Sequence, residues 1–285
     1  MVKQQSRSLF QRTIKHPIST ILIGTLTVIL ATLLVKELIS KPILSSLFSV
    51  EPTIKAITAT IGSIAMFLAY RLHLNYFEKK SFSEFSFKHV HKEFPIGLMI
   101  GFGAMGMVVF ILYLLGYYHL VAIKSFYEFL PTIAFIFGAA VLEEIIFRGL
   151  IFRLLENWKG PIIALLASSL VFQLPHFMNL HTGISPAILG VLFGVVTGLM
   201  YAYTRRLWLP IAFHFSWNLV QPIFITTLSG GKFISLFEGE LAGPELLIGS
   251  EFGLEVSLFS FGFLLIIGLY YYAKLKSKGY FKQHN

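Results

Sequence analysis

Eight apolar stretches, each near the roughly 20 residues that a membrane-spanning helix needs, constrain the fold of this sequence more than any other feature. Only 13% of the 285 residues are charged, against about 25% in soluble domains, and the mean hydropathy is +0.74. We place the stretches at residues 18–39, 53–73, 95–117, 129–156, 161–179, 184–204, 208–228 and 252–273. The sequence therefore predicts an all-α, polytopic transmembrane helix bundle of about eight spans, forming a single membrane domain over residues 1–285.

The basic residues between these stretches predict the orientation of the bundle. Of the 23 Lys and Arg residues, 18 fall in or next to alternate segments, starting with the N-terminal one. Cytoplasmic loops carry an excess of Lys and Arg, so we expect an integral, multi-pass protein with both termini in the cytoplasm. The short chain without a separable soluble domain indicates a bacterial plasma membrane. Topology thus accounts for the net charge of +9, and no nucleic-acid partner is expected. Without Cys, thiolate nucleophiles and Cys-ligated metals are excluded.

Three polar segments carry further expectations. Residues 1–16 and 81–94 interleave basic and apolar side chains, which is typical of helices lying at a membrane interface. The segment 229–251 is acidic and is expected to be a long outer loop. Closely spaced glycines should let helices approach one another. These are Gly97, Gly101, Gly103 and Gly106, followed by Gly190, Gly194 and Gly198.

Two adjacent carboxylates and a guanidinium interrupt the fourth stretch, as Glu143, Glu144 and Arg148. A charge inside a bilayer is costly, so such a residue is a functional-site hypothesis by default. Glu144 and Arg148 are four residues apart, share a helix face and can pair. Glu143 lies about 100° further round the helix and needs a partner from another helix. A structural ion pair with Arg148 would account for Glu144. A role in setting the topology at the membrane boundary would account for Arg148. Neither accounts for Glu143.

The fifth and seventh stretches carry imidazoles. His176 follows Phe172 by four residues, and Asn218 follows His214 by four, so each pair shares a helix face. With a rise of about 1.5 Å per residue, Glu143, His176 and His214 all lie about 9–12 Å below the predicted cytoplasmic boundary. A site shared by the three helices is therefore geometrically allowed.

These side chains fit two kinds of hydrolytic chemistry. A carboxylate and an imidazole around one water form a general-base pair, and a second imidazole with an amide suits an oxyanion hole. No Ser is spaced like an activated nucleophile, so direct attack of water on a peptide carbonyl is the simplest reaction. Two His and one Glu are also the ligands of many hydrolytic zinc sites. A metal site made of Glu143, His176 and His214 therefore stays open as an alternative.

The spacings Glu143-Glu144-x-x-x-Arg148, Phe172-x-x-x-His176 and His214-x-x-x-Asn218 resemble the three motifs of the CAAX prenyl endopeptidase and bacteriocin-processing (CPBP, or Abi) membrane proteases. They occur in order, on separate predicted helices, within about residues 137–220, and we take residues 129–228 as the catalytic core. The resemblance implies an intramembrane glutamate-type endopeptidase, similar to the Ras-converting enzymes, with a cavity open to the cytosol.

The resemblance also implies roles. In that family the first Glu and the His of the second motif activate water, the second Glu supports the site, and the third motif stabilises the oxyanion. Carried over to this chain, the catalytic residues are Glu143, Glu144, His176, His214 and Asn218. Arg148 and Phe172 would be supporting residues. The expected partners are the lipid bilayer and a peptide or membrane-protein substrate, and no cofactor is expected, with zinc as the alternative. Because the family includes members with immunity or scaffolding roles, a non-catalytic immunity or regulatory membrane protein is a further alternative.

Overall fold

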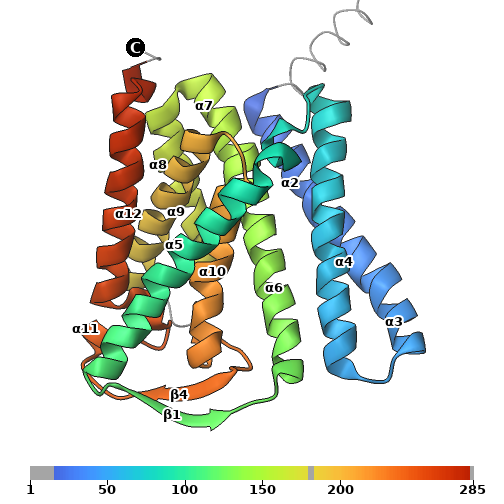
Figure 1. Cartoon of the computed structure of the whole chain (residues 1–285). Helices are drawn as coiled ribbons and strands as arrows, with labels where there is room; N and C mark the ends of the chain where they lie inside the picture. Colours follow the sequence, from blue (N-terminus) through green and yellow to red (C-terminus); the bar gives the residue numbers. More distant parts are fainter. Residues whose placement is uncertain (1–15, 179–182, 283–285) are drawn as a thin grey trace, which may run out of the picture.

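The computed structural model describes residues 16–178 and 183–282 and is a bundle of long helices (Figure 1). The helices are α2 (Pro17–Leu33), α3 (Lys41–Leu47), α4 (Glu51–Leu72), α5 (Phe87–Leu114), α6 (Phe126–Glu144), α7 (Arg153–Lys159), α8 (Pro161–Gln173), α9 (Ile184–Thr204), α10 (Trp208–Phe224), α11 (Glu245–Ile248) and α12 (Leu258–Ser277). π-Helical turns at Leu34–Ser40 and Ile145–Phe152 join α2 to α3 and α6 to α7. Pro17–Leu47 and Phe126–Lys159 are therefore continuous helical rods.

The structure confirms the predicted fold class, because each of the eight apolar stretches corresponds to a helix. Within the described residues, six helices are long and apolar enough to cross a membrane: Pro17–Leu47, Glu51–Glu78, Phe87–Leu114, Phe126–Lys159, Ile184–Thr204 and Leu258–Ser277. The fifth and seventh stretches form shorter helices, Pro161–His176 and the 17-residue α10. The expected N-terminal interfacial helix lies outside the described residues.

Helix α2 shows how a chain of this composition packs in a membrane. Its small and β-branched residues Thr20, Gly24, Val28 and Thr32 face the bundle and are buried, whereas bulky residues such as Leu26 stay exposed. Lipid is as apolar as a leucine side chain, so the gain lies in close helix contact through small residues and not in hiding leucines. The helical form also satisfies the backbone hydrogen bonds that lipid cannot.

The segment 81–94 corrects one expectation. It is not a separate interfacial helix: a 3-10 turn covers Ser83–Phe85, and α5 then runs from Phe87 through Pro95 to Leu114 without a break. A proline inside a helix removes one backbone hydrogen bond, which transmembrane helices tolerate when neighbours compensate. The polar side of this segment serves protein contacts, since the buried Glu93 accepts a 2.6 Å hydrogen bond from Nε of Arg206.

The bundle has two different ends, which we call the α7 end and the sheet end (top and bottom of Figure 1). At the sheet end, β1 (Tyr118–Ile123) pairs antiparallel with β4 (Phe237–Leu241), and β2 (Thr227–Leu228) pairs with β3 (Gly231–Lys232). A 2.8 Å salt bridge between Lys124 and Glu238 adds to the first sheet. The acidic segment 229–251 is thus partly ordered as strands, which its sequence did not predict.

The α7 end holds a network of buried ionic groups. Glu78 receives bidentate hydrogen bonds of 2.7 and 2.6 Å from Arg153, and Glu84 accepts hydrogen bonds from the hydroxyls of Tyr70 and Tyr201. Burial raises the pKa of the Glu84 carboxyl, and the nearby Arg153 acts in the opposite direction. These pairs fasten the end of α4 and the turn before α5 to the bundle.

Helices α5 and α10 pack closely against each other beside the site. A Cβ atom on Gly101 would lie 2.6 Å from the backbone oxygen of Phe213 and 2.8 Å from the nitrogen of Trp217. The predicted close approach is also confirmed at Gly97, Gly190, Gly194 and Gly198. It is wrong for Gly103 and Gly106, whose added Cβ atoms would meet open space within 4 Å.

This contact gives a matched pair of variants. We expect Gly101→Ala to lower the free energy of unfolding by about 1–3 kcal/mol, the usual cost of overpacking, because backbone atoms cannot move aside as a flexible side chain can. Gly103→Ala on the same helix should be neutral or slightly stabilising, since Ala is the better helix former. Thermal unfolding in detergent measures both, and equal melting temperatures for the two variants would contradict the packing described here.

Candidate active site

Glu144 is a fully buried carboxylate held from two sides. Its Oε2 lies 3.2 Å from Nε of Arg148 one turn later, and its Oε1 lies 2.9 Å from Nδ1 of His214 on α10. Both Glu144 and Arg148 have no exposed surface. The expected pairing on one helix face is therefore present, and Glu144 also fixes the orientation of an imidazole from another helix.

Arg148 is anchored beyond this pair. It donates a 3.1 Å hydrogen bond to the backbone oxygen of Gly194 and another to the hydroxyl of Thr197. Its guanidinium lies over the Phe172 ring, 4.7 Å from the centroid, in a cation–π geometry. Arg148 thus ties the turn after α6 to α8 and α9, which a boundary residue serving topology alone would not do.

Glu143 points elsewhere, as its position on the helix predicts. Its side chain keeps 28% of its surface exposed, and Oε2 lies 3.8 Å from Nε2 of His214. The ring of His214 therefore sits between two carboxylates, with Nδ1 towards Glu144 and Nε2 towards Glu143. Because an ionised carboxylate only accepts hydrogen bonds, Nδ1 carries the hydrogen shared with Glu144, and Nε2 faces the reactive side. The sequence did not predict this bridging position.

The second motif lies at the end of α8. His176 is half-buried in the 3-10 turn Leu174–Met178, and its Nδ1 lies 3.3 Å from the backbone oxygen of Phe172. The Phe172 ring contacts both imidazoles, with centroids 5.4 Å from His176 and 6.1 Å from His214. Phe172 is therefore a packing element at the centre of the site, as its chemistry suggests.

The motif residues meet in one cavity of about 260 Å³. Glu143, His176, His214 and Asn218 all line it, from α6, the end of α8, and α10. Apolar walls surround them, including Phe172 and the Phe193 ring of α9, which lies 4.8 Å from His214. The structure thus brings together side chains that are up to 75 residues apart in the sequence.

The cavity also contains a carboxylate that the sequence reasoning missed. Glu255, just before α12, is buried, lines the cavity and accepts hydrogen bonds of 2.7 Å from Ser229 and 3.2 Å from Gln221. Burial raises the pKa of the Glu255 carboxyl, while those hydrogen bonds and the charge of His176 oppose the shift. No motif spacing links Glu255 to the other residues, so only the fold reveals it.

The zinc site predicted as an alternative is not preformed among the described residues. Among the residues that the structure describes, which include Glu143, His176 and His214, no group of three or more His, Cys, Asp or Glu side chains is disposed to hold a metal ion. A zinc site would require these side chains to move together from the positions seen here.

Comparisons with known proteins agree with the motifs. Residues 125–220 match the family model described as type II CAAX prenyl endopeptidase Rce1-like. A Bacillus subtilis (strain 168) protein named "Putative membrane peptidase YdiL" is 30% identical over 112 residues, which are 39% of this chain and 42% of that protein. The chain thus matches less than half the length of this relative. No solved structure matches. The matched segment contains all three motifs, and over it the chain is similar to CAAX-type membrane peptidases.

Proposed function

We propose that this chain is an intramembrane endopeptidase that hydrolyses a peptide bond with a water activated by Glu143 and His176. The observation that carries the proposal is the gathering of Glu143, His176, His214 and Asn218 around one cavity. The family match and the relative named as a membrane peptidase support it. The relative's bacterial source and the distribution of basic residues further support a bacterial plasma membrane with cytoplasmic termini.

In this mechanism Glu143 accepts a proton from the water, and the oxygen of the water forms a bond to the carbonyl carbon of the substrate. The amide nitrogen takes up the proton as the carbon–nitrogen bond breaks, so one water is consumed for each bond cleaved. His176, on the facing wall, orients the water. General-base catalysis of this kind typically contributes a factor of about 10²–10⁴.

His214 and Asn218 would stabilise the negative oxygen of the tetrahedral intermediate. The Asn218 amide is a donor in any protonation state. His214 can donate a hydrogen bond from Nε2 only when that nitrogen carries a hydrogen. The Glu143 carboxyl, whose Oε2 lies 3.8 Å from Nε2, is placed to exchange that proton. Glu144 and Arg148 hold the ring so that it need not reorient during the reaction, which is the advantage of a preorganised site.

The proposal is tested by comparing membrane and secreted peptides from cells that carry the wild type with those from cells that carry Glu143→Gln. Fragments present only with the wild type identify substrates and cleavage sites. If substitution of Glu143, His176 and His214 in turn leaves the peptide pool unchanged, the chain acts without hydrolysis, as an immunity or regulatory protein would.

The reaction is expected to be independent of metal. The purified protein should contain less than one equivalent of zinc by elemental analysis, and hydrolysis should survive prolonged treatment with a chelator, because the carboxylate and not a metal-bound hydroxide activates the water. Activity that is lost on chelation and restored by added zinc would replace this mechanism with the zinc alternative of Glu143, His176 and His214.

A further inference from the structure

The cavity that holds the site extends towards only one end of the bundle. On α6 its lining residues are Phe135, Ala139 and Glu143, and on α10 they are His214 and Asn218. In both helices these positions run from the level of the site towards the sheet end. Further wall comes from the end of α8, from the first half of α9 and from the sheet end, where Leu228, Ser229, Gly231, Phe233, Phe252 and Glu255 line the cavity.

A second, larger hollow adjoins this cavity at the sheet end. It has a volume of about 1050 Å³ and is lined by β4, α11 and the segments on either side of them. Pro186 of α9 lines both hollows. Along residues 225–233 and 252–256, some residues line the catalytic cavity and others line the larger hollow. We call the larger hollow the vestibule. Its size accommodates several residues of an extended peptide next to the catalytic side chains.

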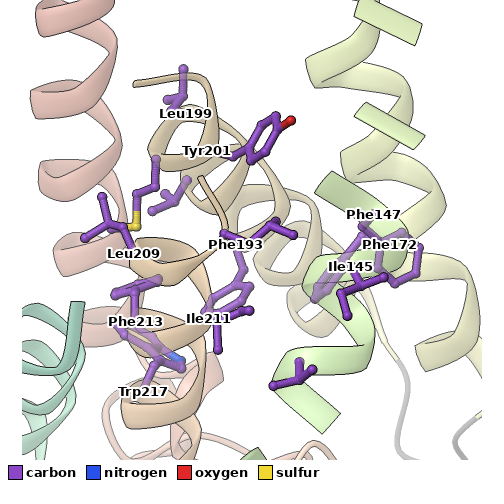
Figure 2. Close-up of a cluster of buried hydrophobic side chains, with 14 of the residues drawn as sticks. Ile145, Phe147, Phe172, Phe193, Leu199, Tyr201, Leu209, Ile211, Phe213 and Trp217 are labelled. Atoms are coloured by element: carbon purple, nitrogen blue, oxygen red, sulfur yellow. The ribbon is translucent and has the colours of Figure 1, made fainter. Parts of the chain in front are cut away.

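Towards the α7 end the site is sealed by packed side chains. Arg148, Leu150 and Ile211 have no exposed surface. Figure 2 shows the apolar cluster around the site, in which Leu199, Tyr201 and Leu209 lie on the α7 side and Phe193 stacks on Phe213 at a centroid distance of 5.5 Å. No residue of α7 or of the ionic network lines either hollow. Among the described residues, neither hollow reaches the α7 end, so a polar substrate would approach Glu143 from the sheet end.

The basic residues identify which side of the membrane each end faces. Those at the α7 end that the structure describes are Arg71, Lys79, Lys80, Lys88, Lys92, Arg153, Lys159, Arg205, Arg206, Lys274, Lys276, Lys278 and Lys282. Those towards the sheet end are Lys36, Lys41, Lys55, Lys124 and Lys232. An excess of Lys and Arg marks the cytoplasmic side, so the sheet end faces away from the cytoplasm.

We infer that the site is reached from the extracytoplasmic side, through the vestibule, and that its substrates are peptide segments exposed on that side of the membrane. This inference rests on the proposed function for the identity of the substrate as a peptide, but not for the direction of access. It departs from the cavity open to the cytosol that the family resemblance implies. A cytosolic opening and the orientation given by the basic residues cannot both hold for the cavity described here.

The absence of Cys from the sequence makes a labelling test direct. Single substitutions Ser229→Cys and Phe233→Cys place a thiol in the wall of the catalytic cavity, Glu251→Cys places one in the vestibule, and Asn157→Cys places one at the exposed surface of α7. Intact cells are treated with a charged maleimide that does not cross membranes, before and after permeabilisation.

We expect the two cavity variants and Glu251→Cys to be labelled in intact cells, and Asn157→Cys only after permeabilisation. The inference is overturned if neither cavity variant reacts in intact cells, or if Asn157→Cys does. Two cavity positions are used because Ser229 donates a hydrogen bond to Glu255, which its replacement removes.

A second arm separates this inference from the proposed function. A peptide cleaved by the purified protein is supplied outside right-side-out vesicles or outside inverted vesicles. Cleavage only with right-side-out vesicles supports both statements. Cleavage only with inverted vesicles keeps the peptidase and removes the extracytoplasmic route. If the cavity variants are labelled from outside but the purified protein cleaves none of the peptides offered, the route stays and the peptidase is removed.

Discussion

Glu143→Gln is expected to lower kcat for peptide hydrolysis about 10²–10⁴-fold, the range that a positioned general base contributes. The amide has the shape of the carboxyl group but cannot take a proton from water. Since 28% of the Glu143 side chain is exposed in the cavity, the substitution removes no buried ion pair, and the unfolding temperature should stay within the error of the wild type. Steady-state hydrolysis by the purified protein measures the effect.

Glu128→Gln is the matched control for this variant. It makes the same chemical change in the first turn of the same helix, at an exposed position, and should leave kcat and KM unchanged. A Glu143→Gln protein that retains more than about a tenth of wild-type kcat would show that another group supplies the base, and Glu255, the further carboxylate of the cavity, would be the next to replace.

Arg148→Met is expected to destabilise the fold by about 3–5 kcal/mol, the usual cost of leaving one member of a buried ion pair without its partner. The methionine fills much of the volume but leaves Glu144 with no cation on its own helix. It also removes the hydrogen bonds to Gly194 and Thr197. Chemical unfolding in detergent, followed by tryptophan fluorescence, gives the change in free energy.

The double variant Glu144→Gln/Arg148→Met shows whether the unpaired charge of Glu144 causes the loss of stability in Arg148→Met. With both ions removed, the buried carboxylate no longer needs a counter-charge, and much of the lost stability should return, because replacing a whole buried pair is often nearly neutral. A double variant as unstable as Arg148→Met alone would assign the loss to packing around Phe172 instead. Activity should not return in the double variant, because His214 would still lack the carboxylate that fixes its ring.

The sequence predicted the helices and the meeting of the motifs because both depend on short-range regularities. Apolar runs of spanning length leave the backbone few alternatives in lipid, and a four-residue spacing sets which side chains share a helix face. The pairing of Glu144 with Arg148 and the separate direction of Glu143 followed from that geometry alone.

The features that escaped prediction depend on contacts between distant segments. Strands β1 and β4 pair across more than a hundred residues, and neither has a pattern that specifies its partner. Glu255 reaches the cavity only because the segment before α12 folds back against Gln221. Glu93, two residues before Pro95 in α5, pairs with Arg206, a partner that no local pattern identifies. The sequence likewise could not show which end of the bundle the hollow occupies.

One wall of the cavity is synthesised after the three motifs, and this order bears on the biogenesis of the protein. The residues around Ser229 and Glu255, and the strand that closes the sheet with β1, follow all three motifs in the chain and are synthesised after them. The first helices can insert and pair while synthesis continues, but the pairing of β1 with β4 must wait, as contacts between remote segments do. A nascent chain therefore passes through the translocation machinery with its three motifs already made and the chamber around them still incomplete.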